Sequence, residues 1–152
     1  MFKKGVKLWK DTKKIIPGGS MLYSKRAENF LPEIWPSYYK KAKGCYIWTL
    51  ENKKLLDFSL MGCGTNTLGY SVNKIDNAVI QRIKKSNMSS LNCTEEVLLA
   101  KKLIKIHPWA EQVKFARTGG EANAIAIRIA RSINPLRQNI GVCGYGGWHD
   151  WY

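Results

Sequence analysis

The sequence predicts an α/β fold, because strand-like and helix-like segments alternate along the second half of the chain. Residues 113–115 alternate apolar and charged side chains and are expected to form a short strand. A Thr-Gly-Gly turn follows at residues 118–120, and residues 121–131 are good helix formers. Residues 139–143 form a second apolar run, expected to be the next strand. A strand, a helix and a parallel strand in this order build one α/β layer.

The first half of the chain is expected to form a smaller α+β segment. Residues 1–16 are basic and amphipathic, which predicts a short helix that ends at the Pro-Gly-Gly-Ser turn of residues 17–20. Residues 20–37 contain two prolines and are expected to be irregular. Residues 44–50 and 55–60 have the pattern of strands, so they predict a β-hairpin or the start of a small meander.

Two helices are expected between the predicted hairpin and the Thr-Gly-Gly turn. Residues 74–85 carry apolar side chains at helical spacing. A second helix is predicted to begin with Thr94 as its N-cap and to extend to Lys105, shortly before a proline. We therefore expect an N-terminal segment of residues 1–70, followed by residues 71–152 as the start of a larger domain.

Composition narrows the classes of protein that the chain can belong to. The net charge of +14 over 152 residues comes mostly from lysine pairs spread along the sequence, which favours a solvated basic surface over a nucleic-acid groove. The four cysteines show no metal-ligand spacing and no disulfide framework, so a cytoplasmic protein without a bound metal is expected. No run reaches the roughly 20 apolar residues of a membrane span, and no membrane partner is expected.

The Thr-Gly-Gly turn is the strongest candidate for a binding site. A strand that turns through glycine into a helix directs unpaired N–H groups and the positive helix end at one point, where phosphate is a common occupant. The loop after residues 139–143 lies at the same edge of the predicted sheet, and its Tyr145 could supply a flat aromatic face. A plain β–α turn without a ligand explains the glycines equally well at this point.

The segment VKFARTGGEAN at residues 113–123 resembles the RF-x-(N/R)-(S/T)-G-(T/G)-E-A-N segment of class III aminotransferases. The sequence is most similar to the glutamate-1-semialdehyde 2,1-aminomutase branch and its aminotransferase relatives. Short motifs near residues 17, 42, 56 and 94 follow in the family's order, so the resemblance covers nearly the whole chain. It implies the type I fold of pyridoxal 5′-phosphate (PLP) enzymes, here its N-terminal α+β segment and the incomplete start of the large, mostly parallel sheet domain.

The resemblance also implies roles for individual residues. Thr118, Gly119 and Gly120 would bind the cofactor phosphate, and Tyr145 would stack on the pyridine ring. The glycine at position 120 replaces a hydroxyl residue that many members have, which removes one donor but keeps the backbone N–H.

Two positions resemble family residues that meet the substrate, a small amino donor or acceptor. Arg26 resembles an N-terminal arginine of the family that binds the substrate carboxylate. Met61 stands near the sequence position at which aminomutases have a tryptophan beside the substrate, so substrate preference can differ. Gly146 stands where the family commonly has histidine, which removes a side chain beside the cofactor ring.

The Schiff-base lysine and the acid that pairs with the pyridine nitrogen come later in family members, and no lysine of this chain matches that motif. We therefore expect an N-terminal portion of an enzyme, a truncated product or split fragment, that is inactive alone and belongs to a homodimer when complete. Two other interpretations stay open from the sequence: a small basic protein that binds nucleic acid, and a non-catalytic dimerisation piece.

Overall fold

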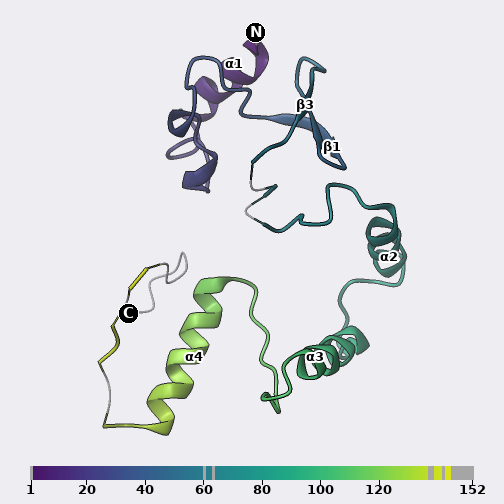
Figure 1. The fold of residues 1–152 in the computed structure, drawn as a ribbon, viewed down its shortest axis with the longest axis vertical. Coiled ribbons are helices and arrows are strands. Elements are labelled where there is room, and N and C mark those ends of the chain that lie inside the picture. The colour runs from purple at the N-terminus through teal and green to yellow at the C-terminus, as the bar shows by residue number, and fades with distance from the viewer. Residues whose placement is uncertain (1, 60, 63, 137–138, 142, 145–152) are drawn as a thin grey trace. The chain divides into compact units, whose positions relative to one another are not determined.

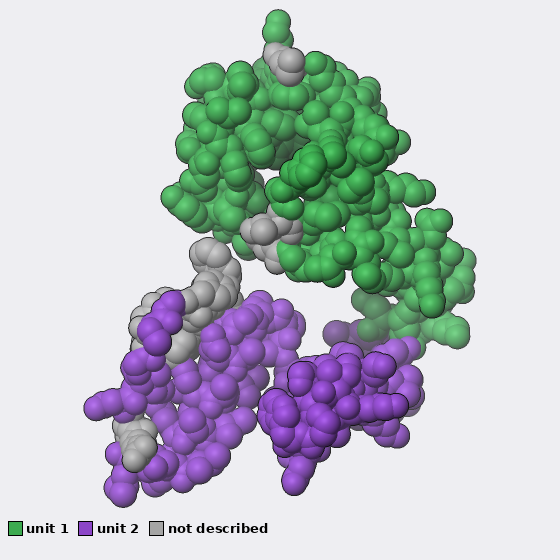
Figure 2. Space-filling model, viewed as in Figure 1, with its two compact units in different colours: residues 1–87 green, residues 88–152 purple. Residues whose placement is uncertain are grey.

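The structure is a computed structural model that describes residues 2–59, 61–62, 64–136, 139–141 and 143–144. The chain forms two compact units, residues 1–87 and 88–152, which Figure 2 shows in green and purple. Each unit is described by itself. The predicted domain boundary after residue 70 stays a prediction.

Unit 1 begins with helix α1 (Lys3–Thr12), labelled in Figure 1. Its buried residues are Gly5, Trp9 and Thr12, whose spacing of four and three places them on one stripe of the helix. The helix ends at Thr12, not at residue 16 as the sequence predicted. Turn hydrogen bonds replace the helical pattern over the next residues, and Gly19 donates its N–H to the carbonyl of Ile16.

The small sheet of unit 1 has three antiparallel strands in the order β1-β2-β3: Tyr39–Lys43, Tyr46–Thr49 and Lys54–Leu56. Of the two expected arrangements, a hairpin or a meander, the structure has the meander, but the strand predicted at residues 55–60 ends at Leu56. The sequence did not predict β1, because its Tyr-Lys-Lys-Ala-Lys segment lacks apolar alternation. One of its lysines makes a cross-strand contact: the Lys41 ammonium lies 4.5 Å from the centre of the Trp48 ring opposite it.

Unit 1 also contains two short 3₁₀ turns, η1 (Tyr23–Lys25) and η2 (Ala27–Asn29), inside the segment expected to be irregular. Helix α2 (Asn73–Ile83) follows the sheet and agrees with the predicted helix within two residues at each end. Ala27 is fully buried. With Trp9 it forms the buried hydrophobic centre among the described residues of this unit.

Unit 2 contains helices α3 (Thr94–Ile106) and α4 (Gly119–Ile133). Both were expected, but Thr94 was the wrong N-cap. Cys93 occupies that position without a capping side-chain hydrogen bond, and the Thr94 hydroxyl bonds to the Glu95 carboxylate at 3.2 Å instead.

The two strands predicted in unit 2 are not formed among the described residues. Residues 113–118, which precede α4, contain no strand, and residues 139–141 and 143 are irregular as well. Val142 lies outside the described residues. A strand is defined by hydrogen bonds to a neighbour, and no described segment pairs with either of these two. Among the helices that the structure describes, none is both long and apolar enough to cross a membrane.

Candidate functional site

The head of helix α4 is built by a threonine cap. Thr118 has an extended backbone (φ −135°, ψ 160°), which brings its side chain back over the first helical turn. Its hydroxyl oxygen accepts a hydrogen bond from the backbone N–H of Glu121 at 3.1 Å, and its carbonyl accepts one from Ala122 at 3.0 Å. The hydroxyl proton is still available, because a hydroxyl donates one hydrogen bond while it accepts others.

The backbone N–H groups of Gly119 and Gly120 have no hydrogen-bond partner in the part of the chain that the structure describes. They are the first two amides of α4, where a helix cannot satisfy its own donors. Neither residue has a Cβ atom between its backbone and a ligand; Gly119 is exposed, whereas Gly120 is buried. Two free amides, one hydroxyl donor and the positive end of a 15-residue helix fit a phosphate ester.

Glu121 and Arg117 complete this turn, and the sequence interpretation gave neither of them a role. The Glu121 carboxylate accepts a hydrogen bond from the Arg117 backbone N–H at 2.9 Å and pairs with the Arg117 guanidinium at 3.0 Å. The Thr-x-x-Glu spacing of a capping box was the sequence signal that could have found this contact. Here the glutamate reaches one residue further back than in the usual box.

The ring-stacking residue expected from the sequence, Tyr145, lies outside the described residues, as does Gly146. The predicted stacking on a cofactor ring therefore stays a prediction. The described residues offer no cluster of three or more metal-ligating side chains.

Arg26 belongs to unit 1, where it packs between a glycine turn and an aromatic ring. Its guanidinium carbon lies 5.2 Å from the centre of the Tyr23 ring. A Cβ atom at Gly18, which has a φ of +71°, would lie 2.3 Å from the nearer guanidinium nitrogen, so only glycine allows this approach. The Arg26 Nε atom is buried, and no described group accepts its hydrogen. The predicted carboxylate contact is compatible with this unpartnered donor and stays a prediction.

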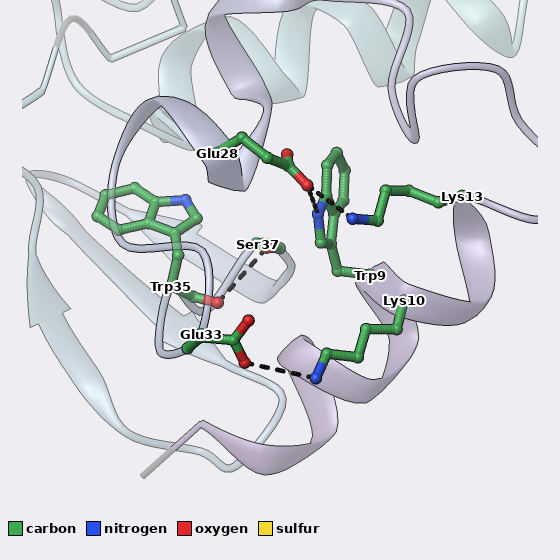
Figure 3. A network of polar contacts seen from close by, with 7 residues as sticks. All are labelled: Trp9, Lys10, Lys13, Glu28, Glu33, Trp35 and Ser37. Atoms are coloured by element: carbon green, nitrogen blue, oxygen red, sulfur yellow. Dashed lines mark hydrogen bonds and ion pairs between the residues drawn. The ribbon is translucent and has the colours of Figure 1, made fainter.

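A polar network anchors helix α1 to the segment that carries Arg26 (Figure 3). The Glu28 carboxylate accepts hydrogen bonds from the Lys13 ammonium at 2.7 Å and from the Trp9 indole at 3.1 Å. These two donors, the lysine first, lower the pKa of Glu28 to about 2. Lys10 and Glu33 form a second, longer ion pair of 3.4 Å across the same interface.

Unit 1 also contains a cavity of about 560 Å³ that is partly open to solvent. Its wall includes the aromatic residues Trp9, Phe30, Trp35, Tyr38, Tyr39 and Tyr70. Neither Arg26 nor Met61 is part of the lining, although their chain neighbours Lys25 and Gly62 are. Met61 has a φ of +42°, a left-handed backbone conformation that is uncommon for a side chain of its size. Its predicted place beside the substrate stays a prediction.

Asp57 and Tyr70 form a hydrogen-bonded pair in the cavity wall. The Tyr70 hydroxyl donates to the Asp57 carboxylate at 2.6 Å. Burial, together with this carboxylate, raises the pKa of Tyr70 to about 12. Burial also acts to raise the pKa of Asp57, but hydrogen bonds from Ser59 and Tyr70 outweigh it and leave that pKa below its ordinary value.

Residues 29–144 match the family model described as aminotransferase class-III. The chain belongs to the class-III aminotransferase family. The resemblance seen in the sequence is thereby confirmed, and PLP is the cofactor on which this family depends.

Curated relatives of this class-III chain include an aminotransferase and an aminomutase. It is 34% identical over 149 residues to the 3-aminobutyryl-CoA aminotransferase of Cloacimonas acidaminovorans (strain Evry), which is 97% of this chain and 35% of that protein. It is 37% identical over 145 residues to the glutamate-1-semialdehyde 2,1-aminomutase of Nitrosopumilus maritimus (strain SCM1), covering 95% of this chain and 33% of the relative. The chain thus spans about a third of the length of these relatives.

Solved structures confirm the fold class. The FumI protein of Sphingopyxis sp. MTA144, in its PLP internal aldimine form, superposes with a TM-score of 0.75 at 23% identity, over 86% of this chain and 31% of its own. An omega-transaminase from Sphaerobacter thermophilus gives a TM-score of 0.71 at 24% identity, over 84% of this chain and 28% of its own. At these identities the likeness establishes the α/β fold of the class-III chain and nothing about its substrate.

Proposed function

We propose that this chain supplies the phosphate-binding turn of a PLP-dependent aminotransferase or aminomutase. The observation that carries the proposal is the pair of unpartnered amides at Gly119 and Gly120, beside the capping hydroxyl of Thr118. When bound, PLP supplies the electron sink for chemistry at the amino-bearing carbon of the substrate. The contribution of this chain is to hold the phosphate and so to fix where the cofactor ring lies.

The substrate in this proposal is a small molecule with a carboxylate or a carbonyl group. Arg26 would bind the carboxylate, since a guanidinium presents paired donors to two carboxylate oxygens. Its stacking on Tyr23 and its unpartnered Nε atom support this role. Met61 would lie near the substrate and Tyr145 on the cofactor ring. The names of the relatives leave open whether the amino group moves within one molecule or between two.

We further propose that this chain acts together with the polypeptide that completes a class-III fold, and that the full enzyme is a cytoplasmic homodimer. Exposed apolar side chains on its helices support the first part of this proposal, because they could pack against the additional polypeptide. On α3, for example, Val97, Leu98 and Leu99 are 55%, 63% and 50% exposed, although large apolar side chains of a finished core are mostly buried. The Schiff-base lysine would come from that additional polypeptide. The chain of 152 residues should therefore not turn over an amino donor when PLP is added.

The test compares two ligands that differ only in the phosphate, pyridoxine 5′-phosphate and pyridoxine. Neither has the aldehyde that would react with surface lysines, so binding reports recognition alone. Calorimetric titration of the chain should show saturable binding of the ester and none of the alcohol. Thr118→Val keeps the shape of the side chain but removes its hydroxyl, and should weaken ester binding, whereas Thr118→Ser should not. Equal binding of the two ligands, or of neither, would refute the proposed phosphate site.

A further inference from the structure

The carboxylate of Glu121 creates an electrostatic problem at the proposed phosphate site. Glu121 is the third residue of α4 and follows directly after the two glycines whose amides would hold the ester. A carboxylate in the first turn stabilises a helix through the positive helix end, but it repels any other anion that occupies the same end. A doubly charged phosphate ester would experience this repulsion in full unless another group offsets it.

Arg117 is placed to offset this charge. Its guanidinium lies 3.0 Å from one oxygen of the Glu121 carboxylate, while its backbone N–H bonds to the other oxygen at 2.9 Å. The two residues flank the Thr-Gly-Gly turn in the sequence, one on each side. The Arg117 side chain is 90% exposed and that of Glu121 is 29% exposed. An ion pair this exposed contributes little to folding stability, so its main effect is on the local charge.

We propose that Arg117 is a positioning residue of the phosphate site, which neutralises Glu121 and thereby lets one helix end accept a dianion. This inference rests on the proposed function. It assigns the pair an electrostatic role, in which removing the Arg117 charge lowers ligand affinity and removing the Glu121 charge does not. The alternative is a structural clamp, in which the ion pair only holds the turn in shape. A clamp would lose affinity when either residue is changed.

The experiment measures binding of pyridoxine 5′-phosphate to the full chain by calorimetric titration at low ionic strength. Arg117→Met removes the positive charge that lies beside the Glu121 carboxylate, so affinity should fall about five- to tenfold. Glu121→Gln keeps an oxygen that accepts the Arg117 N–H but frees the guanidinium, so affinity should equal or exceed that of the unchanged chain. The double variant should return close to the original affinity, since both charges are then gone.

Arg128→Met is the matched control. It removes the same charge from a position inside α4, about 14 Å along the helix from Gly119, where the residue is exposed, and should change affinity less than twofold. Far-UV circular dichroism verifies that each variant keeps its helices. If Arg117→Met loses helix content, Arg117→Gln serves as the second charge-removing variant.

The outcomes separate this inference from the proposal on which it rests. Opposite effects of the two single variants, with recovery in the double variant, support the charge role of Arg117. Loss of affinity in both single variants without recovery, or no change in Arg117→Met, overturns it while the phosphate site itself stands. Absence of binding by the unchanged chain refutes the phosphate site, and the inference with it.

Discussion

Replacing Gly119 by proline would delete a single backbone donor from the proposed phosphate site. Gly119 is the first residue of α4, the position at which proline is best tolerated, because that N–H has no partner within the helix. The preceding residue must then adopt an extended backbone, and Thr118 already has φ −135° and ψ 160°. The substitution therefore removes one N–H group without disturbing the start of the helix.

The size of the effect follows from the kind of hydrogen bond that is lost. A hydrogen bond to a charged group contributes about 1.5–3 kcal/mol, which corresponds to a loss of affinity of about tenfold to 150-fold. Folding stability should move in the other direction, because replacing glycine by proline at a compatible position stabilises by about 0.4–1 kcal/mol through the unfolded chain. Weaker binding combined with equal or higher stability is the signature that distinguishes a lost donor from a damaged fold.

The assay is calorimetric titration with pyridoxine 5′-phosphate, accompanied by thermal unfolding followed by circular dichroism. Gly119→Ala is the matched control, since it adds a side chain but keeps the N–H. If the proline and alanine variants both bind the ester as tightly as the unchanged chain, the Gly119 amide does not contact the phosphate, and the geometry inferred for the site is wrong.

Two further predictions concern unit 1. The pKa of Glu28 is lowered from 4.5 to about 2 in the folded chain. The bonds of its carboxylate to Lys13 and Trp9 therefore stabilise the fold fully at pH values above 4.5, and this contribution is lost as the pH falls through 2. In chemical unfolding experiments, Glu28→Gln should therefore be less stable than the unchanged chain at pH 6, with a difference that shrinks towards pH 2; a constant difference would contradict the prediction. Gly5→Ala should lower the unfolding midpoint, although alanine is normally better than glycine in a helix by about 1 kcal/mol, because its Cβ would lie 2.1 Å from the backbone oxygen of Pro36. A raised midpoint would show that the backbone at Pro36 yields to the added methyl group.

Sequence patterns identified the helices of this chain better than its strands. The helices were predictable because their apolar residues recur at helical spacing and their ends carry recognisable residues, such as the proline that follows α3. The meander was predictable from β2 and β3. Strand β1 was missed, because its lysines leave no apolar alternation to detect, and the contact of Lys41 with the Trp48 ring on the neighbouring strand is not a local pattern. The strands expected at residues 113–115 and 139–143 require partners that no local pattern can specify.

For the candidate site, too, some features could be predicted from the sequence and others could not. The sequence by itself determined the family and the Thr-Gly-Gly turn, because a threonine cap and residues without a Cβ atom act over a few neighbouring positions. Only the tertiary structure decided that Arg26 lies over Gly18 and against Tyr23, that Glu28 joins α1 to that segment, and that Asp57 meets Tyr70. These contacts join residues whose side chains must be brought together by packing. Packing depends on the shapes of all the surfaces involved, whereas a helix cap depends on a few consecutive residues.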